Sequence, residues 1–134
     1  MLKCGDIISL EHVNTERNMQ GRTNKALISG LNEVSGASKG KTTDISENWV
    51  IECKNQGDNQ NKEIINGNSV FYLKNEKTNE YLGTSPEYNY HRGNCGHRCP
   101  IMGQLEISSF SYQSHQTTWS LRHVTTLRLI YREF

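Results

Sequence analysis

An internal repeat constrains the fold of this chain more than any other sequence feature. The segment Gly30-Leu31-Asn32-Glu33-Val34-Ser35 returns as Gly103-Gln104-Leu105-Glu106-Ile107-Ser108. Likewise, Asn48-Trp49-Val50-Ile51 returns as Thr118-Trp119-Ser120-Leu121. The spacing between equivalent residues drifts by a few positions, as insertions and deletions in polar loops would produce. Such a repeat predicts two similar structural units.

The first unit is predicted to consist of short β-strands without a helix, and the second is expected to be formed of strands and loops as well. Ile8 and Leu10 alternate with polar residues, which is the period of a strand. Glycine, asparagine and serine are frequent, and these residues favour turns. We expect loops at 22–29, 36–47 and 85–101. The expected strands lie at 4–13, from Met19, at 31–35, 48–53, 69–73, 81–82, 105–110 and 118–123.

The length of 134 residues suits one domain. We expect a single domain over 1–134, and the sequence leaves open whether its tail forms a strand or a short helix. Within that domain we expect repeat A at 3–53, a polar connector at 54–66, repeat B at 67–123 and a tail at 124–134.

Composition argues against several classes of protein. The formal net charge is +1 with acids and bases interspersed, so we expect no nucleic-acid partner. No apolar run is long enough to cross a membrane. The chain opens without a signal peptide, which favours a cytosolic protein or a piece of a longer one. It contains no glycine-rich phosphate loop, HExxH motif or nucleophile elbow, so we expect no catalytic residues and no cofactor.

The repeated residues are predicted to be structural. Trp49 and Trp119 hold equivalent places and are expected to pack in or against the core. Glu33 and Glu106 are also equivalent, which favours a structural hydrogen bond in each unit over an acid–base pair. We assign Gly30 and Gly103, which open the repeated segments, to the same structural set.

The first hairpin offers a candidate binding site at His12, Asn14, Arg17 and Asn18. The favoured interpretation is turn chemistry, in which Asn14 bonds nearby backbone and His12 is half-buried. The alternative is that the exposed tip presents Arg17 and Asn18 to a partner.

A second cluster contains His91, Cys95, His97 and Cys99. Histidine and cysteine at this density can bind zinc. The Cys-x₃-Cys spacing with one intervening histidine is not a familiar zinc-ligand pattern, so we expect no metal. A small Cys95–Cys99 disulfide loop or two free thiols is the favoured interpretation.

The segment from Cys4-Gly5 through His12-Val13-Asn14-Thr15, together with residues 29–35 and Trp49–Cys53, resembles a MIR repeat. This repeat occurs in stromal cell-derived factor 2-like proteins, protein O-mannosyltransferases and calcium-release channels, and the resemblance is strongest to the first group. It implies an all-β fold, a β-trefoil of MIR type that is incomplete, with the second and third repeats but not the first. A trefoil lacking one repeat would expose strand edges. We therefore expect either the tail to cover such an edge or the chain to form a homo-oligomer.

The resemblance also implies a function. It points to a non-catalytic module in the endoplasmic reticulum lumen that works with an Hsp40-type co-chaperone and an Hsp70 on unfolded clients. It favours a Cys4–Cys53 disulfide over two free thiols. One alternative is a carbohydrate- or peptide-binding MIR module of a protein O-mannosyltransferase, with a glycan as ligand. Another is a cytosolic regulatory domain of a calcium-release channel, in which the cysteines would be reduced.

Overall fold

The structure is a computed structural model that describes residues 2–38, 40, 43–54 and 69–121. Most of the expected connector and the whole expected tail lie outside the described residues, so those two expectations stay predictions. No helix in the described part of the chain has the length and apolar character that a membrane span requires.

The described chain is built almost entirely of antiparallel strands, which confirms the all-β prediction. The first repeat contains β1 (Ile7–Ile8), β2 (Glu11–His12), β3 (Arg17–Lys25), β4 (Asn32–Ser38), a short 3₁₀ helix η1 (Ile45–Glu47) and β5 (Trp49–Cys53). The second contains β6 (Phe71–Asn75), β7 (Tyr81–Asn89), α1 (Arg92–Cys95), β8 (Leu105–Phe110) and the 3₁₀ helix η2 (His115–Thr117).

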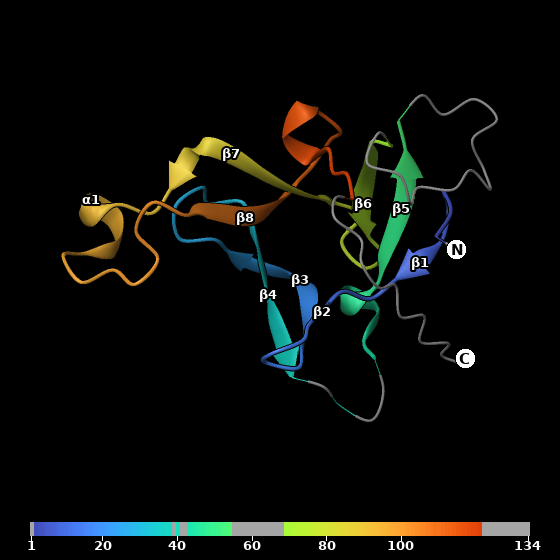
Figure 1. Ribbon diagram of the computed structural model, residues 1–134, viewed down its shortest axis with the longest axis horizontal. Helices are drawn as coiled ribbons and strands as arrows, with labels where there is room; N and C mark the ends of the chain where they lie inside the picture. Colours follow the sequence, from blue (N-terminus) through green and yellow to red (C-terminus); the bar gives the residue numbers. More distant parts are fainter. Residues whose placement is uncertain (1, 39, 41–42, 55–68, 122–134) are drawn as a thin grey trace.

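All eight strands belong to one curled sheet in the order β1-β5-β6-β7-β8-β4-β3-β2 (Figure 1). Its two end strands, β1 and β2, are consecutive pieces of one extended segment. This segment pairs with β5 through Ile7 and Ile8 and with β3 through Glu11 and His12. The covalent chain therefore joins the two ends of the sheet.

Within the described residues, an unpaired strand edge remains along part of β4. The pairing of β4 with β8 is limited to Asn32↔Ser109 and Glu33↔Ser108. Among the described residues, the rest of β4 through Ser38 is paired only with β3. The expected exposed edge therefore lies along β4, and the homo-oligomer that was expected from it stays a prediction.

The repeat persists in three dimensions. The β3–β4 hairpin closes with the Ala26 amide donating to the Leu31 carbonyl at 2.7 Å, and the β7–β8 hairpin closes with the Tyr90 amide donating to the Gln104 carbonyl at 2.9 Å. Gly30 and Gly103 have φ of 71° and 86°, in the left-handed region that favours glycine. The two repeated glycines thus occupy equivalent positions in the turns of the two hairpins.

The 3₁₀ helix η1 corrects the expectation of a first unit without a helix, and η2 is its counterpart in the second unit. Each directly precedes its repeat's tryptophan strand or bridge and begins with a capping box, at Asp44 in η1 and Ser114 in η2. The Asp44 carboxylate accepts hydrogen bonds from the hydroxyl and amide of Ser46, and these bonds lower its pKa. A single helical turn is too short to produce the apolar period that sequence patterns detect.

The core is formed mainly by β5, β6 and β7. Trp49 and Ile51 are fully buried on one face of β5, as its alternating pattern predicted. Phe71, Leu73 and Leu82 pack with them, while Trp119 is half-buried against this cluster. The expectation that both tryptophans pack in or against the core is met by their observed positions.

Several predicted boundaries are wrong. The strand expected at 4–13 is split into β1 and β2, and the loops expected at 22–29 and 85–101 begin inside β3 and β7. Both long strands contain bulges, between Gly21 and Lys25 and between Thr84 and Asn89. Pro86 lies in the second bulge, where its missing N–H costs no ladder bond. Of the strand expected at 118–123, the described residues 118–121 contribute one bridge, Phe71↔Trp119, and residues 122–123 lie outside the described part of the chain.

Candidate functional site

The feature that most distinguishes the two repeats lies at the end of the β7–β8 hairpin. In the first repeat, residues 27–29 suffice to connect Ala26 with Gly30. In the second, residues 91–102 connect Tyr90 with Gly103, although the backbone bonds that close both turns are equivalent. We call residues 91–102 the basic tip. Figure 1 shows it, with α1, at the far end of the hairpin from β5 and β6.

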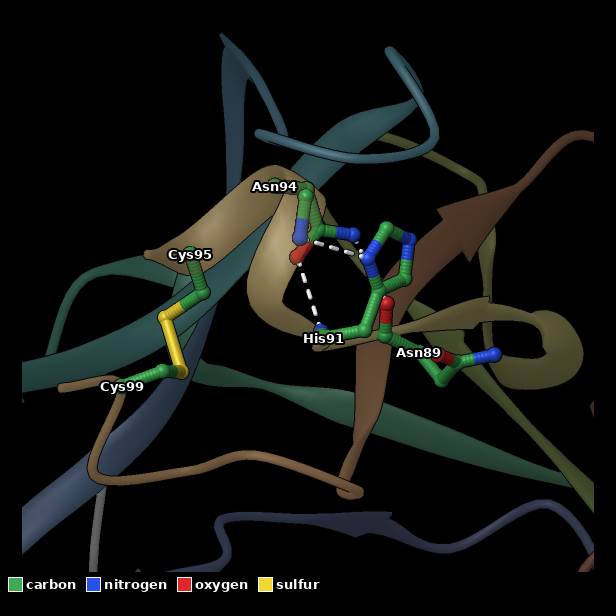
Figure 2. The surroundings of a disulfide bond; sticks show 6 residues. Asn89, His91, Asn94, Cys95 and Cys99 are labelled. Carbon is green, nitrogen blue, oxygen red and sulfur yellow. Dashed lines mark hydrogen bonds between the residues drawn. A yellow bond between two sulfur atoms is a disulfide. The ribbon is translucent and has the colours of Figure 1, made fainter. Parts of the chain in front are cut away.

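Local hydrogen bonds hold the basic tip in shape (Figure 2). His91 Nδ1 accepts from the Gly93 amide at 3.0 Å, and Asn94 Oδ1 accepts from the His91 amide at 2.9 Å. These two bonds form the capping box of α1. The Asn94 side chain also donates to the Asn89 carbonyl at 2.9 Å, which ties the helix to the end of β7.

A disulfide between Cys95 and Cys99 closes the other side of the basic tip, with a Cα–Cα distance of 5.3 Å. Both sulfurs are therefore committed to each other rather than available as thiolate ligands. His91, the first histidine of the predicted cluster, is used as a helix cap. Within the described residues, no group of three or more His, Cys, Asp or Glu side chains could hold a metal ion.

The basic tip is exposed and carries one sign of charge. None of residues 91–105 is buried. His91, Arg92, His97 and Arg98 are all exposed, and no acidic residue occurs between Glu87 and Glu106. Since the whole chain has a formal net charge of only +1, the basic tip is a local concentration of positive charge.

Beside the basic tip, β8 reverses the usual alternation of a half-buried strand. Leu105 and Ile107 are 42% and 37% exposed, whereas Glu106 and Ser108 are 4% and 0% exposed. Leu105 and Ile107 share one face of the strand. We call this pair the apolar face of β8. A strand was correctly predicted at 105–110. The sequence did not indicate that Leu105 and Ile107 would lie on its exposed face.

Glu106 is buried because the turn of the β3–β4 hairpin satisfies its carboxylate. It accepts from the Ile28 amide at 2.7 Å, the Ser29 amide at 3.2 Å and the Ser108 hydroxyl at 2.7 Å. Burial acts to raise the pKa of Glu106, but hydrogen bonding to the side chains of Ser29 and Ser108 and to the amides of Ile28 and Ser29 outweighs burial and lowers it. Glu106 thus fastens the turn of repeat A to a strand of repeat B.

The expected equivalence of Glu33 and Glu106 is wrong for their side chains. Glu33 lies in β4 opposite Ser108 and makes no side-chain hydrogen bond to the described residues. The reason is that Glu106 bonds backbone amides of the short turn at 27–29. The equivalent turn in repeat B is replaced by the basic tip.

The four predicted binding residues of the first hairpin do not form one exposed site. His12 is exposed, contrary to the half-buried position expected, and its Nδ1 lies 2.8 Å from the Thr15 hydroxyl. Asn14 is exposed in the turn. Arg17 donates to the Ser38 hydroxyl at 3.0 Å.

Asn18 requires a correction, because it is only 3% exposed. Its side-chain amide donates to Glu47 Oε1 at 3.0 Å, which links β3 to η1. A residue committed to this buried bond cannot be presented to a partner. The sequence provided no signal for this role because it did not reveal η1.

The chain is similar to stromal cell-derived factor 2-like proteins along most of its length. It is 30% identical to the Dictyostelium discoideum stromal cell-derived factor 2-like protein over 119 residues, which is 89% of this chain and 50% of the relative. It is 30% identical to human stromal cell-derived factor 2 over 118 residues, 88% of this chain and 49% of the relative. The chain therefore spans about half the length of the curated relatives it matches. No protein-family model matches it.

Solved structures show the same fold. The SDF2-like protein from Arabidopsis thaliana superposes with a TM-score of 0.72 at 21% identity, covering 89% of this chain and 59% of that one. The Saccharomyces cerevisiae protein O-mannosyltransferase Pmt1-Pmt2 complex bound to the sugar donor matches with a TM-score of 0.69 at 22% identity, covering 89% of this chain and 16% of that one. The sequence likeness and the trefoil-like fold together identify the chain as a MIR-domain protein of the stromal cell-derived factor 2-like kind.

Proposed function

We propose that this chain is a non-catalytic module that binds unfolded protein clients for an Hsp40-type co-chaperone and its Hsp70 in the endoplasmic reticulum lumen. The apolar face of β8 is the observation that carries the proposal. A strand that buries Glu106 and Ser108 while exposing Leu105 and Ile107 retains apolar surface that burial could have removed from water. Unfolded clients expose apolar side chains of their own, and such surfaces associate.

The two disulfides support a lumenal location. Cys4 and Cys53 are 8% and 7% exposed and belong to the core cluster, with a Cα–Cα distance of 5.5 Å. Disulfides persist in oxidising compartments and are rare in the cytosol. This observation favours the lumenal interpretation over a cytosolic domain of a calcium-release channel, where reduced cysteines are expected.

The test is suppression of client aggregation. Light scattering of a denatured, reduced client would be followed with wild type and with Leu105→Ser/Ile107→Ser. The matched control is Val13→Ser/Ile45→Ser, which removes two side chains that are 79% and 51% exposed elsewhere. We expect wild type and the control to slow aggregation and the β8 variant to lose most of this effect. Equal activity in both variants would refute the role of the apolar face.

The partnership is tested separately. Co-precipitation of the oxidised chain with a lumenal Hsp40-type co-chaperone, in the presence and absence of an unfolded client, should recover the co-chaperone. Failure to recover it under both conditions would contradict that part of the proposal while leaving client binding to be judged by the scattering experiment.

Glycan binding is the second candidate, motivated by the fold likeness to the O-mannosyltransferase complex. Sugar stacking needs an exposed aromatic ring. Trp49 is fully buried and Trp119 is half-buried, with their indole N–H groups bonded to backbone carbonyls. Titration with mannose oligosaccharides, monitored by tryptophan fluorescence, would detect such binding.

A further inference from the structure

We propose that the basic tip is a preorganised docking element for an acidic polypeptide segment of a partner protein. This inference concerns a surface separate from the apolar face of β8. It does not depend on the proposed binding of unfolded clients.

The fold does not need the basic tip to close the β7–β8 hairpin. The β3–β4 hairpin makes the same closing backbone bonds with only residues 27–29 in its turn. None of residues 91–105 is buried, so the basic tip adds no apolar residue to the core. Its presence is therefore not explained by packing.

The basic tip is nevertheless held in one conformation. The His91–Asn94 capping box, the Asn94 bond to Asn89 and the Cys95–Cys99 disulfide all act within it or at its base. The Gly96 amide donates to the Arg92 carbonyl at 3.0 Å, and the Cys99 amide donates to the Gly96 carbonyl at 3.3 Å. Rigidity in an exposed loop lowers the entropy cost of binding a partner.

The positive charge of the basic tip is accessible to a partner. Arg92 and Arg98 are exposed, and neither makes an ion pair with the described residues. The flanking acids do not neutralise them by contact: Glu106 is occupied by Ile28, Ser29 and Ser108, and Glu87 accepts from Ser85. The guanidinium groups are therefore available for carboxylates, which they can bind in a bidentate manner.

The small number of basic side chains in the basic tip indicates which kind of acidic partner it fits. Nucleic acids and sulfated glycans are bound by dense runs or broad patches of Lys and Arg. The basic tip offers two arginines and two histidines on a chain of nearly neutral charge. This arrangement matches a short stretch of Asp or Glu in an extended polypeptide better than a polyanion.

The experiment measures fluorescence anisotropy of a labelled Asp/Glu-rich peptide titrated with the oxidised chain at low and physiological salt. We expect wild type to bind and to weaken as salt rises. Arg92→Gln/Arg98→Gln should weaken binding roughly tenfold or more, because two surface charge contacts are lost. The matched control, Arg22→Gln/Lys25→Gln, removes the same charge from exposed positions on the equivalent hairpin and should change the affinity less than about twofold.

Two further variants separate shape from charge. Cys95→Ser/Cys99→Ser keeps both arginines but removes the disulfide that closes the basic tip, and should weaken peptide binding by roughly threefold. Replacing residues 91–102 with the Leu-Ile-Ser sequence of 27–29 should leave a folded chain that does not bind the peptide. Urea unfolding of each variant verifies that the sheet is retained.

Several results would overturn the proposal. Wild type could fail to bind the peptide, or the Arg22/Lys25 control could lose as much affinity as the Arg92/Arg98 variant. Retained binding after the tip replacement would also exclude the basic tip. So would tighter binding of a sulfated oligosaccharide or a single-stranded oligonucleotide of matched charge. Leu105→Ser/Ile107→Ser should leave peptide binding unchanged, so failure of the client-binding proposal can be distinguished from failure of this one.

Discussion

Trp49 and Trp119 make the same hydrogen bond in the two repeats. The indole N–H of Trp49 donates to the Met19 carbonyl at 3.0 Å, and that of Trp119 donates to the Leu82 carbonyl at 2.9 Å. Met19 and Leu82 are themselves repeat-equivalent residues of β3 and β7. Each indole hydrogen bond therefore ties the segment at the end of its repeat to an earlier strand of the same repeat, β3 for Trp49 and β7 for Trp119.

Replacing each tryptophan by phenylalanine should reveal how much this hydrogen bond and the packing of the indole ring contribute to the free energy of unfolding. Trp49→Phe removes a hydrogen bond worth about 1 kcal/mol and leaves a gap around a fully buried ring, so we expect a loss of about 2–3 kcal/mol. Trp119→Phe loses the same bond from a half-buried site and should cost about 1–2 kcal/mol. Urea unfolding at neutral pH measures both. A larger loss for Trp119→Phe would contradict the assignment of Trp49 to the centre of the core.

Trp49 and its neighbours also show what the sequence could predict. Repetition identified the two tryptophans, the two glycines at the hairpin turns and the strand character of 31–35, 48–53 and 105–110. These features depend on short-range patterns: alternation along a strand, or a glycine where φ is positive. The resemblance to MIR repeats supplied the trefoil-like fold and the disulfide between Cys4 and Cys53.

The candidate site was harder to predict because it depends on contacts between distant residues. Asn18 looks like a turn residue but bonds Glu47 from η1. Glu33 and Glu106 look alike, yet only Glu106 faces the free amides of the turn at 27–29. The exposure of Leu105 and Ile107 depends on which face of β8 the turn of the β3–β4 hairpin covers, and a pattern of alternation does not specify that face.

Glu106→Gln should destabilise the chain by about 2 kcal/mol at neutral pH, because the buried carboxylate loses charge-assisted bonds from Ile28, Ser29 and Ser108. Glu33→Gln is the matched control at the equivalent position. It should change the free energy of unfolding by less than about 0.5 kcal/mol. Equal losses in the two variants would show that net charge, rather than the hydrogen bonds of Glu106, stabilises the hairpins.

The same pair of variants tests a pH dependence. The pKa of Glu106 is lowered in the folded chain, so its contribution is fully present above the unfolded pKa of about 4.3 and is lost as pH falls through the folded pKa. The difference in unfolding free energy between wild type and Glu106→Gln should therefore shrink as pH falls below about 4. Chemical unfolding from neutral to strongly acidic pH measures it. A constant difference would mean that Glu106 is not stabilised as a carboxylate.

Gly21→Ala should destabilise the link between β3 and β6. A methyl group at Gly21 would lie 2.6 Å from Asn75 Nδ2 and 2.8 Å from Asn75 Cγ. Asn75 is fully buried, donates to the Ser46 carbonyl at 2.7 Å, and accepts from the amides of Lys77 and Thr78. Because burial and these hydrogen bonds hold the Asn75 side chain in place, we expect the free energy of unfolding to fall by about 1–3 kcal/mol, measured by thermal or urea unfolding.

Gly36→Ala provides the comparison for that substitution. Its added methyl group would approach Arg17 Cβ at 3.1 Å and Arg17 Cδ at 3.2 Å. Arg17 is exposed, so Cδ can move away, and Cβ needs a shift of only a few tenths of an ångström. Replacing a strand glycine also reduces the entropy of the unfolded chain. We expect a change of less than about 1 kcal/mol in either direction. A loss at Gly36 equal to that at Gly21 would indicate a general intolerance of β3–β4 to side chains rather than a specific contact with Asn75.

The two disulfides should differ in both stability and accessibility. Cys4–Cys53 links residues 49 apart in sequence, and Cys95–Cys99 links residues 4 apart. On loop-closure entropy, replacing the first pair by serine should cost about 4 kcal/mol and the second about 2 kcal/mol. Because Cys95 and Cys99 are half-buried at the basic tip whereas Cys4 and Cys53 lie in the core, a rising concentration of reductant should open Cys95–Cys99 first. Alkylation followed by peptide mapping identifies which thiols appear at each step. Opening of Cys4–Cys53 before Cys95–Cys99 would contradict the assignment of one bond to the core and the other to the surface.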